Sequence, residues 1–228
     1  MPRVFIELCT PVFVEGIYNL PMNNDRYTVY GDRRSGNCYK VALILSLTGR
    51  DYDWVETDVI RAETRRPEFL AKNPNGKVPL LEAPDGRLLA ESNAMLLHLA
   101  EGSKYLPEDP WQRALVYQWL FFEQYSHEPY IAVARFLLHY DHGIEVTDER
   151  LAMLKERGEQ ALDVMDGVLS DQPYFAGPDF TIADIALYAY THVAGDGGFD
   201  TSGWTSVSRW LRQISSLPGH FDLEDMKT

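Results

Sequence analysis

The sequence predicts an α/β domain over residues 27–102 followed by an all-helical domain over residues 111–220. Strand-like and helix-like patterns alternate in the first part of the chain, whereas only helical patterns follow residue 110. Residues 103–110 directly follow Gly102 and contain two prolines, a composition typical of a linker. The 228 residues are enough for two such units with a substantial core.

The first domain begins with a strand over residues 27–30, where strand-forming residues alternate, and a loop over residues 31–36 follows. A helix starts at Asn37, carries apolar residues at helical spacing and ends at Gly49. The later predicted elements are a strand over 52–57, a helix over 64–71 capped by Thr64 with Pro67 in its first turn, a hairpin of 78–82 and 87–90, and a helix over 92–100. This order is that of a thioredoxin-like domain, because right-handed crossovers leave few other ways to wrap the chain.

The second domain shows helical spacing throughout. A first stripe contains Trp111, Leu115, Gln118, Phe122 and Tyr125. We expect Pro129 to end or kink that helix before residues 130–139 continue. Further helices are predicted over 147–169, from Thr181 onward, and over 205–217. Thr181 can cap its helix while the Asp184 side chain reaches back to the cap N–H, which is the capping-box geometry.

Composition narrows the possible functions. The formal net charge of −13 repels phosphate backbones, so we expect no binding to nucleic acid or to membranes. No apolar run approaches the roughly 18 residues of a membrane helix. Cys9 and Cys38 are too few for a secreted disulfide framework and favour the reducing cytoplasm. His139, Asp141 and His142 lack a recognisable metal-ligand spacing, so we expect no metal site.

Residues 1–26 are expected to form an N-terminal extension outside the core fold. Their apolar run at residues 12–14 lies between Glu7 and Glu15, which makes a poor signal peptide. Met22 stands just before the first predicted strand. We therefore interpret the extension as an upstream mis-start of translation or a cloning remnant.

The most specific stretch of the sequence is residues 73–81, NPNGKVPLL, followed by Glu91-Ser92. Pro79 has no N–H to give to a strand ladder, which leaves the amide and carbonyl of Val78 free for another partner. Ser92 opens a helix, whose unpaired N–H groups and dipole accept a carboxylate. A strand start and a plain helix cap would explain each motif alone. Together they predict a place that holds a small peptide by its backbone and its acid group.

These motifs resemble the glutathione transferase family, and the resemblance runs from about residue 27 to about residue 218. In that family the Val-Pro bond is cis, the Val backbone pairs with the cysteinyl part of glutathione, and a Glu/Gln-Ser pair binds the γ-glutamyl end. The resemblance implies that Val78, Pro79, Glu91 and Ser92 bind glutathione, and Lys77 matches a position near the glycyl carboxylate. It also implies the family's fold, a buried capping box in the helical domain, and a homodimer.

The chemistry is expected where the first strand meets the first helix. There the sequence reads Ser35-Gly-Asn-Cys38, in place of the Cys-x-x-Cys of thiol-disulfide exchange, and a serine cannot form a disulfide. The resemblance to serine-type transferases implies that Ser35 stabilises the glutathione thiolate. Asn37 could donate the hydrogen bond instead, and Cys38 could form a mixed disulfide with glutathione. Ser35 could also be only a helix cap, and Arg33 or its neighbour Arg34 could add positive charge.

The second substrate is expected against the aromatic residues of the helical domain. We select Phe122, Tyr125 and Tyr130 as the electrophile site, since the other rings are needed for the core or a dimer interface. The leading function is a glutathione transferase that uses glutathione as co-substrate, without another cofactor, to attack a hydrophobic electrophile. The alternatives are glutathione-dependent isomerisation, dehalogenation or thiol transfer through Cys38, and a non-catalytic binding module.

Overall fold

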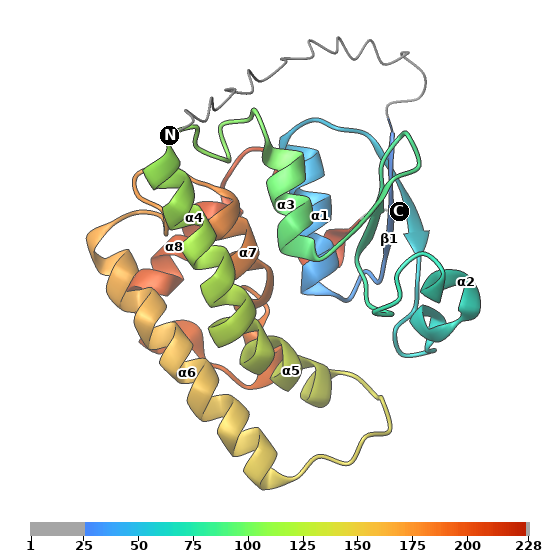
Figure 1. Cartoon of the computed structure of the whole chain (residues 1–228). Coiled ribbons are helices and arrows are strands. Elements are labelled where there is room, and N and C mark those ends of the chain that lie inside the picture. Colours follow the sequence, from blue (N-terminus) through green and yellow to red (C-terminus); the bar gives the residue numbers. More distant parts are fainter. Residues whose placement is uncertain (1–25, 227–228) are drawn as a thin grey trace, which may run out of the picture.

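The computed structural model describes residues 26–226, so all of the predicted extension except Arg26 lies outside the described residues. A small α/β domain lies beside a larger helical domain (Figure 1). The predicted fold class, a thioredoxin-like domain plus an all-helical domain, is confirmed. Among the residues described, no helix is long and apolar enough to cross a membrane.

The sheet has four strands in the order β2-β1-β3-β4. These are β1 (Tyr27–Gly31), β2 (Tyr52–Glu56), β3 (Leu80–Glu82) and β4 (Leu88–Ala90). β1 pairs in parallel with β2 and antiparallel with β3, and β3 pairs antiparallel with β4. Val29 lies opposite Leu81 in the central pair, and both side chains are buried. The sheet edge near the ends of β1 and the start of β3 is where the two predicted glutathione motifs meet.

Three helices accompany the sheet: α1 (Gly36–Leu47), α2 (Pro67–Leu70) and α3 (Ser92–Ala100). α1 and α3 lie side by side on one face, and α2 lies on the other side of the sheet (Figure 1). The helix predicted over residues 64–71 is wrong in its first half. Residues Glu63–Arg65 form a 3₁₀ turn, η1, and Thr64 does not cap a helix. Arg66 is extended, with ψ of 145°, because it precedes Pro67, and α2 starts only at that proline.

The second domain is built from helices alone. They are α4 (Pro110–Phe122), the π turn η2 (Glu123–His127), α5 (Glu128–His139), α6 (Asp148–Asp171), α7 (Ile182–Thr191), α8 (Thr205–Ser215), and the 3₁₀ turns η3 (Ala194–Gly197), η4 (Thr201–Gly203) and η5 (Leu223–Asp225). The predicted capping box is confirmed, since Thr181 and Asp184 make both of its reciprocal bonds at the start of α7.

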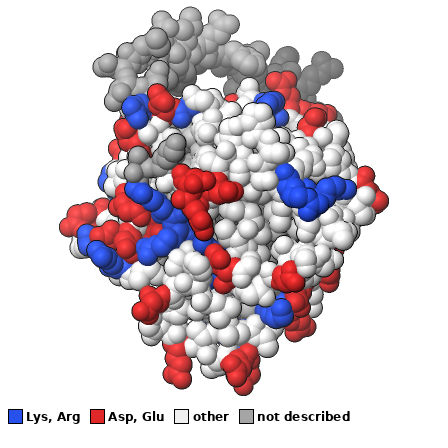
Figure 2. Space-filling view, turned by 180° about the vertical axis from the view of Figure 1, so that it is seen from behind, with Lys and Arg blue, Asp and Glu red and all other residues white. Residues whose placement is uncertain are grey.

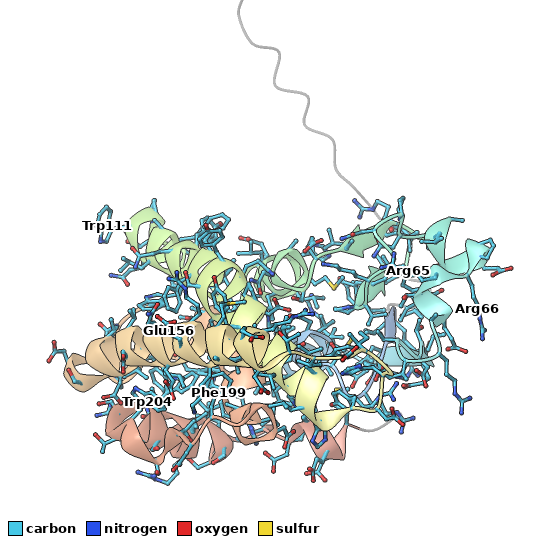
Figure 3. The ribbon with its side chains drawn as sticks, turned by 90° about the horizontal axis from the view of Figure 1, so that it is seen from below. Arg65, Arg66, Trp111, Glu156, Phe199 and Trp204 are labelled. Carbon is cyan, nitrogen blue, oxygen red and sulfur yellow. The ribbon has the colours of Figure 1, made fainter. Side chains whose placement is uncertain are left out.

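The interruption predicted at Pro129 takes the form of the π turn just before it. Pro129 has no N–H to donate to a carbonyl of the preceding turn, and a π turn accommodates the mismatch with one extra residue. The predicted apolar stripe of this helix is wrong at its two ends, although Leu115 and Phe122 between them pack against the core. Trp111 is 72% exposed and projects from the start of α4 (Figure 3), and Tyr125 is 81% exposed. The buried stripe runs instead through Val116, Trp119 and Leu120.

The two domains share one continuous apolar core. Gly36 allows α1 to approach α7, because a Cβ at this position would lie 2.7 Å from the carbonyl oxygen of Ala189. Deeper in the contact, Lys40 Nζ lies 2.8 Å from Glu123 Oε1, and both side chains are fully buried. The end of the chain returns to the first domain, where the Tyr39 hydroxyl donates to the Phe221 carbonyl at 2.7 Å.

Candidate functional site

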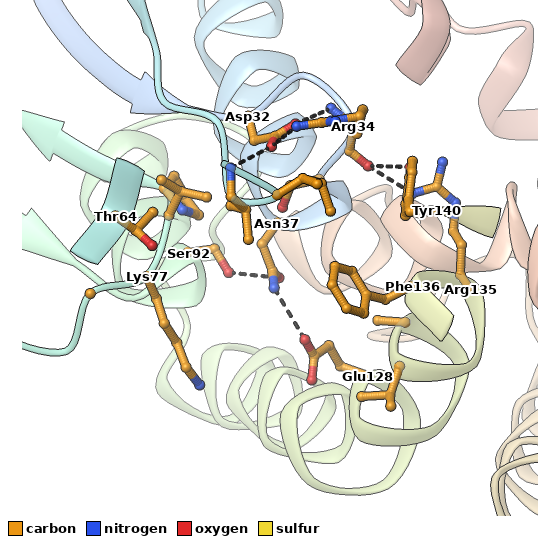
Figure 4. A pocket seen from close by; sticks show the side chains of 18 of the residues that line it. Asp32, Arg34, Asn37, Thr64, Lys77, Ser92, Glu128, Arg135, Phe136 and Tyr140 are labelled. Atoms are coloured by element: carbon orange, nitrogen blue, oxygen red, sulfur yellow. Dashed lines mark hydrogen bonds and ion pairs between the residues drawn. The ribbon is translucent and has the colours of Figure 1, made fainter. Parts of the chain in front are cut away.

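A cavity of about 550 Å³ opens between the first domain and α5 (Figure 4). Its size lies in the roughly 300–1,000 Å³ range of small-molecule sites. The lining comes from the β1–α1 loop with the start of α1, the segment after β2 that includes η1, the turn before β3, the start of α3, the π turn with α5 and the residue that follows it, and Tyr190 of α7. On the face of the molecule that Figure 2 shows, acidic and basic side chains lie close together.

The structure brings the predicted peptide-binding residues together at one wall of the cavity. The Val78-Pro79 bond is cis, as the resemblance implied, and both residues line the wall together with Lys77, Glu91 and Ser92. Within this wall, Asn73 Nδ2 donates to the Lys77 carbonyl at 2.8 Å and so fixes the turn before β3. The backbone of Val78 lies at the cavity, where a peptide can approach it.

Glu91 has a backbone conformation that is uncommon for a residue with a side chain. Its φ is 69°, and it forms the cap position of α3 without a side-chain capping bond. Such a conformation costs roughly 1–3 kcal/mol and persists where the surroundings enforce it. It directs the start of α3, and Ser92 with it, to the cavity wall.

Ser35 lies at the cavity and caps α1. Its Oγ accepts a hydrogen bond from the Cys38 amide, at a long 3.4 Å. The cap uses the oxygen as an acceptor, which leaves the hydroxyl proton free to be donated. The two roles considered for Ser35, helix cap and hydrogen-bond donor to a ligand, are therefore compatible.

The structure does not bring Cys38 to the cavity. The residue belongs to the first turn of α1 and is fully buried on the side of that helix that faces Gly31 of β1. Burial raises the pKa of the Cys38 thiol to about 12. A place in the first turn of a helix favours a thiolate, but here desolvation of the thiolate is the larger effect.

Of the two neighbouring arginines, the structure brings Arg34 to the cavity and not the predicted Arg33. Arg33 points away, pairs with Glu56 at 3.3 Å and does not line the cavity. Arg34 lines it and lies between Asp32 and Asp58, with Nη2 at 2.6 Å and 2.8 Å from their carboxylates. Hydrogen bonding to Asp32 raises the pKa of Arg34 above its ordinary value. The guanidinium is therefore already paired with protein carboxylates.

The predicted electrophile residues do not reach the cavity. Phe122 packs edge-on against Trp119 at 5.0 Å between ring centroids, Tyr125 is exposed, and neither they nor Tyr130 line the cavity. The aromatic residues that do line it are Phe136, Tyr140 and Tyr190. An α-helix turns about 100° per residue, so the extra residue of the π turn moves a different face of α5 to the site.

Four contacts from the helical domain hold Arg34 and Asn37, at the junction of the β1–α1 loop with α1, and the sequence analysis predicted none of them. Arg135 Nη1 and the Tyr140 hydroxyl donate to the Arg34 carbonyl at 2.7 Å and 3.1 Å. The Tyr190 hydroxyl accepts from the Asn37 amide at 3.3 Å, and Asn37 Nδ2 donates to Glu128 Oε1 at 3.2 Å. An arginine within the apolar run of α5 was the one local signal; the others depend on how the domains dock.

Residue Asn37 stands at the centre of the site. Its side-chain nitrogen Nδ2 donates to Glu128, while its Oδ1 accepts from the Ser92 hydroxyl at 3.1 Å (Figure 4). Burial raises the pKa of the Glu128 carboxyl and that of the Tyr190 hydroxyl. Within residues 26–226 no group of three or more His, Cys, Asp or Glu side chains is placed to hold a metal ion.

Comparison with known proteins agrees with this arrangement. Residues 29–104 match the N-terminal domain of glutathione S-transferases and residues 122–218 the C-terminal domain. The crystal structure of a glutathione S-transferase from Pseudomonas fluorescens Pf-5 is 53% identical, with a TM-score of 0.85, covering 87% of this chain and 99% of that one. The structure of Ure2p in complex with glutathione is 25% identical, with a TM-score of 0.78, covering 86% and 96%.

The chain is also similar in sequence to a disulfide-bond oxidoreductase. The disulfide-bond oxidoreductase YfcG of Escherichia coli K12 is 28% identical over 190 residues, which cover 80% of this chain and 87% of that protein. Both halves of the chain, and the order of its elements, are thus those of one family. The chain belongs to the glutathione S-transferase family.

Proposed function

We propose that the protein binds glutathione and transfers it, as a thiolate nucleophile, to an electrophilic small molecule. One observation carries the proposal: a single cavity joins the cis Val78-Pro79 turn, the Ser92 helix start and the Ser35 hydroxyl. In this arrangement the Val78 backbone pairs with the cysteinyl unit, and Glu91-Ser92 with the α-carboxylate and amine of the γ-glutamyl unit. The thiol then points toward the start of α1. The likeness to Ure2p, whose structure was solved in complex with glutathione, supports the first step.

Thiol activation is assigned to Ser35 and Asn37, and Cys38 is left out because it is buried. Lowering the thiol pKa by about two units corresponds to about 2.7 kcal/mol. One hydrogen bond to a charged acceptor supplies about 1.5–3 kcal/mol. A hydroxyl or an amide N–H donated to the sulfur, helped by the dipole of α1, is therefore sufficient.

The electrophile is proposed to lie against α5, where Val133, Phe136 and Tyr140 offer an apolar and aromatic surface. The thiolate attacks the electrophilic carbon, a C–S bond forms, and the leaving group departs with the bonding electrons. In an addition to a double bond, the same attack is completed by protonation of the resulting carbanion.

Titration calorimetry tests the proposal. Reduced glutathione and S-hexylglutathione are titrated into the wild type and into Ser35→Ala, Asn37→Ala and Cys38→Ser, and the ultraviolet thiolate band gives the bound thiol pKa. We expect all four proteins to bind both ligands, with a higher thiol pKa in Ser35→Ala or Asn37→Ala and no change in Cys38→Ser. Absence of binding to the wild type would leave only the fold, and a non-catalytic module would replace the transferase.

A second reaction of the same site, glutathione-dependent reduction of disulfides, is favoured by the likeness to the E. coli oxidoreductase. Since Cys38 is fully buried, it would not supply the attacking thiol. The glutathione thiolate would attack a substrate disulfide and release one thiol, and a second glutathione would resolve the mixed disulfide to oxidised glutathione. Steady-state rates with a dialkyl disulfide and with an aryl halide would distinguish the two reactions.

The protein is also proposed to be a cytoplasmic homodimer. Trp111, Phe121 and Tyr125 are 72%, 73% and 81% exposed along α4 and the π turn, and aromatic side chains in such numbers favour burial against a partner. Sedimentation equilibrium of the wild type and of Phe121→Glu tests this: we expect a dimer that the charged variant dissociates. A monomeric wild type would refute it. The expected cytoplasmic location fits a free thiol and a glutathione-dependent reaction.

A further inference from the structure

We infer that Glu128 is a positioning residue that sets the direction of the Asn37 side-chain amide, so that one amide N–H points to the place of the glutathione sulfur. The inference rests on the proposed function. It adds a residue of the helical domain to the thiol-activating machinery. Glu128 is the first residue of α5, directly after the π turn, and it lines the cavity.

A short chain of hydrogen bonds crosses the cavity floor from one domain to the other. The Ser92 hydroxyl, on α3, donates to Asn37 Oδ1 at 3.1 Å, and Asn37 Nδ2 donates to Glu128 Oε1 at 3.2 Å. The backbone N–H of Asn37 is also occupied, since it donates to the Tyr190 hydroxyl. Both ends of the Asn37 amide are thus bonded, one in each domain (Figure 4).

An ionised carboxylate fixes which way the amide faces. An asparagine amide has one oxygen that accepts and one nitrogen that donates twice. A carboxylate can only accept, so a rotation of the Asn37 amide by 180° would bring two acceptors together. The Ser92 hydroxyl could adapt to either orientation, but Glu128 could not. The carboxylate therefore keeps Nδ2 on its own side, with one N–H bonded to it and the second N–H left for a ligand.

The charges around Glu128 come from each element packed on it. Burial is the largest influence and, with Glu123 of the π turn, raises the pKa of Glu128, whereas Lys40 of α1, Asn37 and Lys77 of the turn before β3 favour its ionised form. Tyr190 of α7 lies near enough to interact with its charge. Lys40 is itself bound to Glu123 at 2.8 Å. The two lysines thus support the carboxylate that the orientation of Asn37 requires.

The π turn explains how a helical-domain residue reaches this position. The turn ends at His127, and the extra residue it contains shifts Glu128 around the helix axis toward α1. Pro129, which provokes the turn, is the next residue. One stretch of the helical domain thus contacts α1 twice. Glu123, at the start of the π turn, pairs with Lys40, and Glu128, directly after the turn, binds Asn37.

The test is a double-mutant cycle. Glu128→Gln keeps the size of the side chain but can both donate and accept, so it no longer selects one amide orientation. We compare the wild type, Glu128→Gln, Asn37→Ala and the double variant. The matched control is Glu156→Gln, which removes the same charge from the exposed face of α6 (Figure 3). Glutathione affinity, bound-thiol pKa, kcat and KM are measured for each, together with the melting temperature.

In Glu128→Gln we expect the bound-thiol pKa to rise by about one unit and kcat to fall about tenfold, with glutathione affinity changed less than about threefold. In the Asn37→Ala background the same substitution is expected to change the bound-thiol pKa by less than about 0.3 units and kcat by less than about twofold, because Glu128 acts through Asn37. Glu156→Gln is expected to behave as the wild type. Should Glu128→Gln fold poorly, Glu128→Asp keeps the charge and is expected to retain a lower thiol pKa than Asn37→Ala.

Two results would overturn the inference while leaving the proposed function intact. One is a wild type that binds and ionises glutathione alongside a Glu128→Gln variant with the same thiol pKa and kcat. The other is an effect of Glu128→Gln that is equally large with and without Asn37. If the wild type binds no glutathione, or does not lower its thiol pKa, the proposed function and this inference fail together.

Discussion

The cavity has two walls that are held in place by different means. The wall formed by Val78 and Ser92 is local: a turn fixed by Asn73 and a helix start fixed by its own backbone position it within the first domain. The wall formed by Arg34 and Asn37 is held from outside, by Arg135, Tyr140, Tyr190 and Glu128 of the helical domain. Binding of the ligand backbone and activation of its thiol therefore depend on different parts of the chain.

The largest loss of stability beside the second wall is expected when the buried ion pair between Lys40 and Glu123 is disrupted. Glu123→Gln leaves the fully buried Lys40 ammonium without its carboxylate, although Asn93 remains within 3.4 Å of it. We expect a loss of about 3–5 kcal/mol in the free energy of unfolding. Urea denaturation measures it. The double variant Lys40→Met, Glu123→Leu is the control and is expected to recover most of the loss. Equal losses in both variants would show that the unpaired charge of Lys40 is not the cause.

The next largest loss of stability is expected at Asp184, near the start of α7, the helix that carries Tyr190 to the cavity. Asp184 is fully buried and accepts from Phe175 N, Thr181 N and Trp210 Nε1 at 3.1, 2.9 and 3.1 Å. Asp184→Asn turns an acceptor into a donor toward these N–H groups, and we expect a loss of about 2–3 kcal/mol in unfolding free energy.

The same carboxyl also predicts a pH dependence. Burial raises the pKa of Asp184 to about 6, from 3.8. The folded state therefore binds the proton more tightly than the unfolded state, so the contribution of this group to stability is largest below pH 3.8 and is lost as pH rises toward about 6. Urea midpoints across this range, for wild type minus Asp184→Asn, should decrease with pH. A difference that is flat or increases would contradict the prediction.

Arg135 allows a finer test of the second wall. Its guanidinium links the Arg34 carbonyl to Asp196, at 2.7 Å and 2.9 Å. Arg135→Met is expected to cost about 2 kcal/mol, since charged hydrogen bonds are worth about 1.5–3 kcal/mol each and Asp196 can be solvated afterwards. Hydrogen exchange should accelerate at the amides of residues 34–37 and not at Val78. Uniform acceleration at both walls would mean that the walls are not independent.

The smallest effect is expected at Cys38, which lies next to the second wall but behind it. Cys38→Ala should change kcat by less than about twofold, because the thiol is fully buried and its pKa is raised to about 12. In a Cys9→Ser background, alkylation at pH 8 should label Cys38 only after denaturant is added. Rapid labelling of the native protein would reopen thiol transfer through Cys38.

The difference between the walls also explains what the sequence could predict. The motifs at Val78-Pro79 and Glu91-Ser92 act through their own backbone, so a turn, a proline and a helix start are visible in neighbouring residues. The order of strands and helices follows in the same way from periodicity. The residues of the local wall and the fold class could therefore be predicted from the sequence.

The helical side of the site was not accessible in this way. Phe122, Tyr125 and Tyr130 were selected from several aromatic residues of the helical domain, and Phe136 and Tyr140 line the cavity instead. Which rings face the first domain depends on how the two domains dock, and no local pattern reports that. Cys38 was judged by its place at a helix start, whereas its burial beneath α1 depends on tertiary packing. Glu128 is polar and adjoins a proline, so nothing in its neighbourhood distinguishes it from a surface residue.

The return of the chain end to α1 has a consequence for how the protein is made. Tyr39 packs against His192 and against Phe221, with ring centroids 5.0 Å and 5.5 Å apart, and its hydroxyl bonds the Phe221 carbonyl. These partners are translated more than 150 residues after Tyr39. Synthesis proceeds at roughly 5–20 residues per second. The face of α1 around Tyr39 therefore stays uncovered until the segment that contains Phe221 has left the ribosome.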